Sequence, residues 1–179
     1  DLEVDWCFFS LEEINREEGK KHPWEREWSY GWSMMRIGAF LKRIDPDLND
    51  AWYFKSGTAL HMEGRKPHAP EVARLLLTEM DQDPGIVEEA LADSTTHDDV
   101  RRDHEIVTSL GGFGVPTLVF DGNERIFGPV LINPPTGDEA EKLWSLVIGW
   151  LEFPNLYEMQ RPKTPLDLEL IGNTFNPYI

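Results

Sequence analysis

The stretch GGFGVPTLVF, residues 111–120, is the part of the chain best suited to binding a ligand, because Pro116 stands directly ahead of a strand-like run. Proline has no backbone N–H, so it opens an inner strand only for a particular reason. A cis Val115–Pro116 bond would turn the chain sharply and leave the backbone groups of Val115 free to pair with a ligand, as an added strand does. The alternative is a trans proline at a strand edge, and the local sequence leaves both open.

Nucleophilic and metal chemistry find little support elsewhere in the chain. Cys7 is the single cysteine, which excludes an intrachain disulfide, a dithiol and a cysteine-rich zinc site. Because it lies between Trp6 and Phe8, we expect an inert, buried thiol. The histidines show no HxxxH spacing: His97 and His104 share one helix face but lack a third ligand. No phosphate-binding glycine motif or nucleophile elbow is present.

Composition restricts the partners. The net charge of −16 argues against binding nucleic acid and against docking on an anionic membrane. No run of apolar residues is long enough to span a bilayer, and no signal peptide is visible, so we expect a cytoplasmic protein. The length suffices for one domain with a real core, or for one domain with an insertion.

The first half of the chain predicts one strand followed by helices. Residues 2–9 are expected to form a strand because apolar and charged residues alternate at its start. After a charged loop, helical patterns fill residues 24–110. The first of these helices would carry Trp24, Trp28 and Trp32 along one stripe, which either lines a pocket for a flat substrate or forms the core of the helical block.

The second half predicts a hairpin and a covering helix. Residues 117–120 and 125–127 flank an Asp-Gly turn signal, which is typical of a β-hairpin. In the segment TGDE, Thr136 is expected to cap a helix while Glu139 reaches back to it. The amphipathic pattern behind it predicts that one face covers a sheet. Residues 161–179 contain three prolines and are expected to form an extended tail.

This order of helix, Gly-Val-Pro-Thr, hairpin and final helix resembles the second half of the thioredoxin fold, with the helical insertion of the DsbA-like variant. The chain is similar, more specifically, to the actinobacterial mycothiol-dependent nitroreductase group of the DsbA family. The segment LEVDWCFFSLEEIN is similar to the second strand of that group. The matching positions are Ser10, Leu11, Asn15, Gly114 to Thr117, Phe127 to Pro129, Pro135 to Gly137, and Leu143-Trp144.

The resemblance implies an α/β fold of the thioredoxin-like (DsbA-like) type with a helical insertion domain, lacking the first β-α unit. Residues 1–15 would supply a strand of the thioredoxin fold, and residues 16–110 the helical insertion, which would form a lid. Residues 111–160 would supply the hairpin and C-terminal helix, and residues 161–179 the tail.

The resemblance also implies which residues bind substrate. In the family the loop proline is cis and faces a Cys-x-x-Cys, and the residue before it offers its backbone to the substrate. Trp24 falls where the group has a tyrosine, so the ring is kept and the hydroxyl lost. His104 matches a histidine that we expect to be packed and hydrogen-bonded rather than an acid or base. The implied substrate-binding residues are Asn15, Trp24, Val115, Pro116 and Thr117.

The dithiol of the family is absent from residues 1–179. We expect that the first strand and helix, which carry it, precede Asp1, since the first residue is not methionine and the chain opens directly into a strand. The alternative is a natural member without redox chemistry. A strand without its neighbour would expose an apolar edge, and an incomplete sheet would invite two copies of the chain to pair.

The function implied is therefore a thiol-dependent oxidoreductase that exchanges disulfides or reduces a small electrophile. Its cosubstrate would be a low-molecular-weight thiol similar to mycothiol, with no bound cofactor or metal, and its partner a small electrophilic or disulfide substrate. Residues 1–179 alone would be inactive, because thiol exchange needs an activated thiolate. The alternatives are a non-redox isomerase or transferase of the same layout, and a ligand-binding module.

Overall fold

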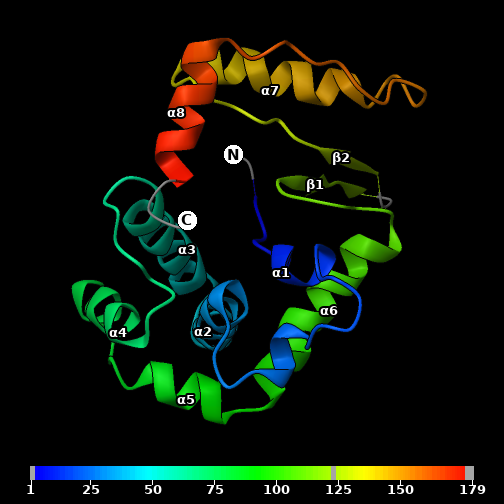
Figure 1. Ribbon diagram of the computed structural model, residues 1–179. Helices are drawn as coiled ribbons and strands as arrows, with labels where there is room; N and C mark the ends of the chain where they lie inside the picture. Colours follow the sequence, from blue (N-terminus) through cyan, green and yellow to red (C-terminus); the bar gives the residue numbers. More distant parts are fainter. Residues whose placement is uncertain (1–2, 122–123, 176–179) are drawn as a thin grey trace. The chain divides into compact units, whose positions relative to one another are not determined.

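The polypeptide divides into two units, Asp1–Val115 and Pro116–Ile179. The computed structural model describes residues 3–121 and 124–175 (Figure 1). The first unit is helical. Its elements are α1 (Leu11–Ile14), the 3-10 helix η1 (Pro23–Glu25), α2 (Tyr30–Ile44), α3 (Pro46–His61), α4 (Pro70–Glu79), α5 (Ile86–Ala92) and α6 (Thr95–Ser109).

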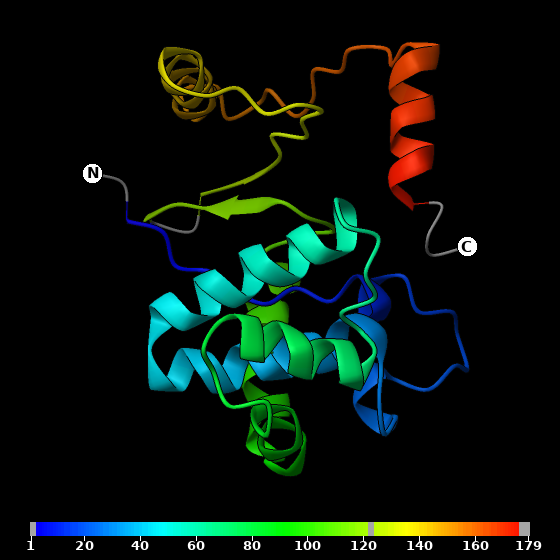
Figure 2. The ribbon, with the colours of Figure 1, turned by 90° about the vertical axis from the view of Figure 1, so that its left-hand side faces the viewer.

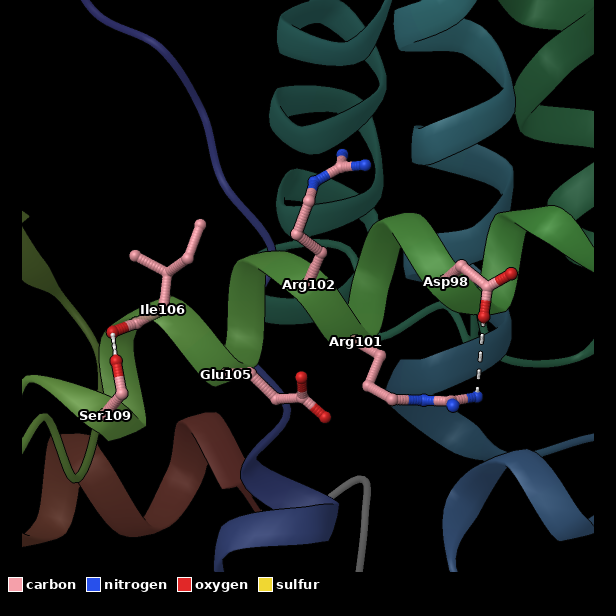
Figure 3. A pocket seen from close by; sticks show the side chains of 6 residues that line it. All are labelled: Asp98, Arg101, Arg102, Glu105, Ile106 and Ser109. Atoms are coloured by element: carbon pink, nitrogen blue, oxygen red, sulfur yellow. Dashed lines mark hydrogen bonds and ion pairs between the residues drawn. The ribbon is translucent and has the colours of Figure 1, made fainter.

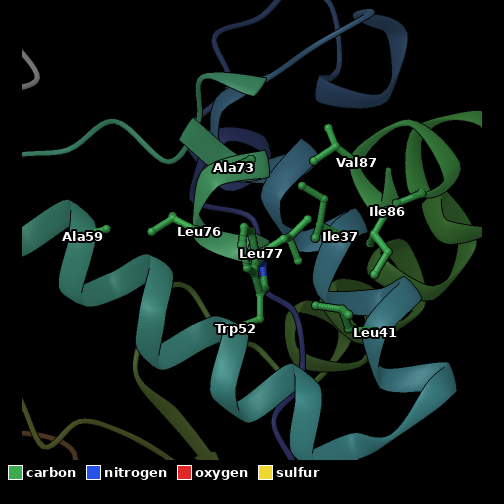
Figure 4. Close-up of a cluster of buried hydrophobic side chains, with 10 residues drawn as sticks. Ile37, Leu41, Trp52, Ala59, Ala73, Leu76, Leu77, Ile86 and Val87 are labelled. Atoms are coloured by element: carbon green, nitrogen blue, oxygen red, sulfur yellow. The ribbon is translucent and has the colours of Figure 1, made fainter. Parts of the chain in front are cut away.

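Helix α2 is the centre of the first unit, because α1, α3, α5 and α6 all pack against it. Figures 1 and 2 both show α3 lying beside α2. The main core lies among α2, α3, α4 and α5, where apolar side chains at helical spacing meet (Figure 4). Its buried members are Ile37, Leu41, Trp52, Ala59, Ala73, Leu76, Leu77, Ile86, Val87 and Ala90.

A second, smaller cluster joins the N-terminal segment to α2 and α6. It consists of Phe8, Trp32, Ala39 and Val100, with Trp24 and Met35 packed against it. Gly38 permits this approach: a Cβ atom there would lie 2.7 Å from Asn49 Oδ1 and 3.1 Å from the Phe8 ring. The first distance would force the Asn49 side chain to move and the second would crowd the Phe8 ring, so packing favours glycine at this position.

The buried side chain of Arg36 ties α2 to the end of α5. Its guanidinium donates to the carbonyl oxygens of Ala90 (3.1 Å), Leu91 (3.0 Å) and Asp93 (3.1 Å), and to Thr96 Oγ1 (2.7 Å). These carbonyls are among those that a helix end leaves without intrahelical partners. Arg36, which belongs to α2, therefore donates hydrogen bonds to carbonyl oxygens at the C-terminal end of α5.

Helix α2 begins at Tyr30 and not at Trp24, so the predicted single helix over this region is wrong at its start. The cause is a distant cap. One carboxylate oxygen of Glu12 accepts from Ser29 Oγ (2.9 Å) and from the backbone N–H groups of Gly31 (3.1 Å) and Trp32 (3.3 Å). A carboxylate at a helix N-terminus satisfies unpaired donors and is favoured by the helix dipole.

The predicted strand at residues 2–9 is also wrong for the part described, since residues 3–10 belong to no strand or helix. The backbone N–H of Phe8 donates to Asp103 Oδ2 (3.2 Å), and that of Ser10 donates to His104 Nδ1 (3.2 Å). Side chains of α6 thus take the place of a neighbouring strand. Two residues of this segment, Val4 and Trp6, are exposed, as an unpartnered alternating pattern would leave them.

The second unit contains the predicted hairpin. Strand β1 (Thr117–Val119) pairs antiparallel with β2 (Arg125–Phe127), with Leu118 opposite Ile126. The centre of the turn lies outside the described residues. The described residues form this two-stranded sheet and no larger one, so the thioredoxin-like fold stays a prediction that rests on resemblance.

Two helices follow in the second unit. Helix α7 (Asp138–Trp150) lies behind the hairpin, and the rings of Phe120 and Trp144 are 6.2 Å apart. The cap expected from Thr136 and Glu139 is wrong: Gly137 is the N-cap, with a positive φ of 56° and no side-chain hydrogen bond.

The tail is not extended, contrary to prediction, because α8 spans Pro165–Phe175. The N–H of Thr164 donates to Asp167 Oδ2 (2.8 Å), while the N–H of Asp167 donates to Thr164 Oγ1 (3.2 Å). This reciprocal pair, together with proline at the first helical position, is a helix N-capping signal that the segment TPLD contains. Within residues 3–121 and 124–175, no helix is long and apolar enough to cross a membrane.

Candidate functional site

The cis peptide bond in the described part of the chain joins Gly128 to Pro129. The Val115–Pro116 bond is therefore trans, and the prediction of a cis bond there is wrong. Pro116 precedes β1, and its carbonyl accepts a hydrogen bond from the N–H of Gly128 (2.9 Å). That bond extends the hairpin by one step, which makes Pro116 the opening residue of an edge strand, where a trans proline is tolerated. Val115 is partly exposed.

The predicted substrate-binding residues fall into both units. Asn15 is exposed at the C-terminal end of α1, where its Nδ2 donates to the carbonyl oxygen of Leu11 (2.9 Å). Trp24 is half-buried within η1. Pro116 and Thr117 begin the second unit. That these residues converge on one site stays a prediction.

The ring of Trp24 is the centre of an aromatic and cationic cluster in the first unit. The imidazole of His22 stacks on it, with centroids 4.3 Å apart and an interplanar angle of 13°. The Arg101 guanidinium lies 5.1 Å from its centroid, and Trp32 packs against it at 5.1 Å with the rings tilted by 54°. A flat ligand that stacks on Trp24 would have to compete with these groups.

Trp32 and His97 extend this cluster into the core. Trp32 is 1% exposed, and its Nε1–H donates to His97 Nδ1 (2.9 Å). Burial lowers the pKa of His97, and the charges of Arg36 and Arg101 lower it further. His97 is thus a neutral imidazole whose Nδ1 accepts. Of the tryptophan stripe, Trp32 is core, as the second of the two interpretations predicts.

His104 is packed and hydrogen-bonded, which confirms the expectation for this residue. Its Nδ1 accepts from the backbone of Ser10, and its ring lies 4.8 Å from that of Phe9. Burial lowers the pKa of His104, so the neutral form that this hydrogen bond requires is favoured. Its role is to hold the N-terminal segment on α6.

Cys7 is exposed, so the expectation of a buried thiol is wrong, although the expectation of low reactivity has support. Partial desolvation, followed by the negative charges of Asp103 and Asp5, raises the pKa of Cys7 to about 11. Its Sγ lies 3.7 Å from Asp5 Oδ2. The thiolate is the nucleophilic form, so this environment disfavours attack by Cys7 at neutral pH.

An open concavity of about 560 Å³ runs along α6 (Figure 3). Successive turns of the helix supply its lining, which carries two positive and two negative side chains, one apolar group and one hydroxyl. The lining residues are Asp98, Arg101, Arg102, Glu105, Ile106 and Ser109. Arg101 belongs both to this lining and to the cluster on Trp24. In the described part of the chain no three acidic, histidine or cysteine side chains are grouped as a metal site requires.

Comparison with known proteins decides the family. The family model described as mycothiol-dependent nitroreductase Rv2466c matches residues 1–161. The chain belongs to the Rv2466c-like family. It is also 55% identical over 178 residues to a Mycobacterium tuberculosis (strain ATCC 25618 / H37Rv) protein named Uncharacterized protein Rv2286c, a match that covers 99% of this chain and 77% of that protein.

Within this member of the Rv2466c-like family, two residues that shape the site were not predicted from sequence. Arg101 lies four residues after His97 and three before His104, on the helix face already marked by the shared position of these histidines. Glu12 lies nearly twenty residues before the residues of α2 that it contacts, and no local sequence motif indicates this contact. The position of Arg101 on the same helix face as the two histidines could therefore have indicated it from the sequence, whereas nothing in the sequence indicated Glu12.

Proposed function

We propose that this chain is the substrate-binding part of a mycothiol-dependent oxidoreductase that reduces a small electrophile, a nitro compound above all. The match of residues 1–161 to a family described as a mycothiol-dependent nitroreductase carries the proposal. The open concavity along α6 supports it as a place for a small polar substrate, because Arg101, which is incompletely paired and lies against Trp24, is part of its lining.

The first two-electron step would convert a nitro group to a nitroso group at the expense of two thiols. One N–O bond breaks, the oxygen leaves as water with the two thiol protons, and the two sulfurs join in a disulfide. Cys7 is a poor candidate for either sulfur because its raised pKa, about 11, leaves about one thiolate in ten thousand at pH 7. One reacting thiol would come from mycothiol and the other from a dithiol that is not among residues 1–179, which contain one cysteine; a second mycothiol would then displace the protein thiol from the mixed disulfide and leave as mycothiol disulfide.

The residues that we propose for substrate binding are Asn15, Trp24, Val115, Pro116 and Thr117. Since the Val115–Pro116 bond is trans, the backbone of Val115 would pair with the substrate from a partly exposed loop rather than from a cis turn. The thioredoxin-like arrangement, the DsbA relationship and the cytoplasmic location are proposed on the resemblance described above.

A second candidate function is ligand binding without turnover, which the single, weakly acidic cysteine favours. One experiment separates the two. The natural gene product is incubated anaerobically with a nitroarene, with and without mycothiol, and the nitro absorbance is followed. Loss of absorbance only in the presence of mycothiol supports the reductase. Binding of the nitroarene without any loss of absorbance would establish the binding module instead.

A further inference from the structure

Arg101 differs from every other arginine of the first unit in how its donors are used. Each of the others donates at least one hydrogen bond to a carboxylate, hydroxyl or carbonyl oxygen: Arg16, Arg26, Arg36, Arg43, Arg65, Arg74 and Arg102. Among the residues that the structure describes, Arg101 has the Trp24 ring and one distant carboxylate as its partners, Asp98 Oδ1 at 3.9 Å.

The Nε atom of Arg101 is buried and has no hydrogen-bond partner among the described residues, and it is the one buried side-chain nitrogen or oxygen there in that condition. Buried polar groups are nearly always paired, so an exception calls for a physical reason. A guanidinium offers five donors in a planar fork that suits two acceptor oxygens at once. The guanidinium carbon of Arg101 lies 5.1 Å from the Trp24 ring centroid, within the range of a cation–π contact, while the side chain as a whole stays 37% exposed.

The position of Arg101 indicates where its partner would lie. It lines the shallow concavity along α6, which is open to solvent and lined by residues of this one helix. Figure 3 shows the Arg101 side chain reaching along the helix toward Asp98, while Arg102 points to another side of the ribbon. Arg102 is satisfied within its own helix by Asp99 Oδ1 at 3.0 Å and lies 3.6 Å from Asp103 Oδ1.

We propose that Arg101 is the residue that recognises the two-oxygen end of the substrate, and that a neutral nitro group fits this place better than a carboxylate. Asp98 and Glu105 lie in the same lining and cancel the two arginine charges. A ligand carboxylate in this lining would share it with both acids, within a chain of net charge −16. A nitro group presents two acceptor oxygens in the same plane without a net charge. This inference rests on the proposed function, which it deepens by naming an anchoring residue.

Calorimetric titration without any thiol tests the inference apart from turnover. The probes are 4-nitrobenzyl alcohol and 4-(hydroxymethyl)benzoate, which differ only in the nitro and carboxylate groups. We expect the natural gene product to bind the nitro probe more tightly. Arg101→Gln should weaken that binding about tenfold, as loss of a charged donor does, whereas the matched control Arg102→Gln should leave it within about twofold. Equal effects of the two substitutions, or tighter binding of the benzoate, would overturn the inference.

A second variant keeps Arg101 in place and tests the charge argument. In the double substitution Asp98→Asn with Glu105→Gln, benzoate binding should improve about tenfold while nitro binding changes little, because only the anion is repelled in the parent protein. Unchanged benzoate binding would contradict the inference. If Arg101-dependent binding is found but mycothiol never reduces the probe, the proposed function fails and the inference stands. If the probe is reduced with identical KM by parent and Arg101→Gln, the inference fails and the function stands.

Discussion

Replacing Glu12 by alanine should destabilise the first unit by about 2–3 kcal/mol. The Glu12 carboxylate caps α2 through Ser29 Oγ and the N–H groups of Gly31 and Trp32, at 2.9, 3.1 and 3.3 Å. Loss of an N-cap costs about 1 kcal/mol, and a hydrogen bond to a charged group contributes about 1.5–3 kcal/mol. The exposed pair with Arg26, at 3.0 Å, adds less than about 1 kcal/mol.

Urea unfolding followed by tryptophan fluorescence measures this change, since Trp32 sits at the capped helix end and is buried. Glu12→Gln keeps an acceptor and loses the charge, so it should cost about half as much as alanine. Glu18 provides the control: it lies in the same N-terminal region and is exposed, so its alanine substitution should change stability by less than about 0.5 kcal/mol. Equal midpoints for Glu12→Ala and Glu18→Ala would refute the assignment of Glu12 as the cap.

Three further predictions concern packing and the thiol. Arg36→Met should destabilise the protein by about 1–3 kcal/mol in the same urea assay, because the Leu91 carbonyl loses its side-chain donor and the Ala90 carbonyl keeps only Thr96 Oγ1; unchanged stability would contradict this expectation. Gly38→Ala should cost about 1–3 kcal/mol, since the added Cβ meets Asn49 Oδ1 at 2.7 Å, and a neutral effect would show that the site relaxes. For Cys7, iodoacetamide alkylation should accelerate about tenfold per pH unit until near pH 11, because the pKa of this thiol is raised; a plateau near pH 8 would disprove the raised value.

The sign of the Cys7 shift also makes a stability prediction. The pKa of Cys7 in the folded protein, about 11, lies above the ordinary thiol value of 9.0, so the folded protein holds the proton more tightly than the unfolded chain. The associated stability is fully present below pH 9 and is lost as the pH rises toward 11. Cys7→Ser should therefore reduce the loss of stability between pH 9 and pH 11, as measured by urea midpoints.

Local chemistry made the hairpin and most helices predictable. An Asp-Gly pair between two short apolar runs predicts the turn between β1 and β2, and the observed pairing of Thr117 with Phe127 agrees with it. Helix α3 begins with an equally local cap, where Asp45 Oδ1 accepts from the N–H of Asp47 (3.0 Å) and Pro46 is the first helical residue. These interactions join residues that are close in sequence, so they form in the folded chain whatever the distant residues do.

The wrong predictions share a long-range cause. The alternating pattern at residues 2–9 is ambiguous because a strand exists only beside another strand, and here the side chains of Asp103 and His104 take that place from nearly a hundred residues away. Helix α2 starts late because Glu12, also distant in sequence, caps it. The start of α8 is a different case, since Thr164 and Asp167 form a local capping pair that the prolines obscured.

The site shows the same division. A ring at Trp24 and a structural His104 could be predicted, because the resemblance placed both on matched positions. That the guanidinium of Arg101 lacks hydrogen-bond acceptors among the described residues could not be predicted, because this depends on which acceptors the fold brings close to it. The trans bond at Pro116 could not be predicted either, because the local sequence is compatible with both isomers.

The most direct test of the account measures how thiol consumption is coupled to nitro reduction. The natural gene product and its Cys7→Ser variant are incubated anaerobically with mycothiol and a nitroarene, and mycothiol disulfide and reduced product are quantified together. We expect one mycothiol disulfide for each two-electron reduction, at the same rate in both proteins. Reduction without disulfide formation, or activity lost on Cys7→Ser, would contradict it.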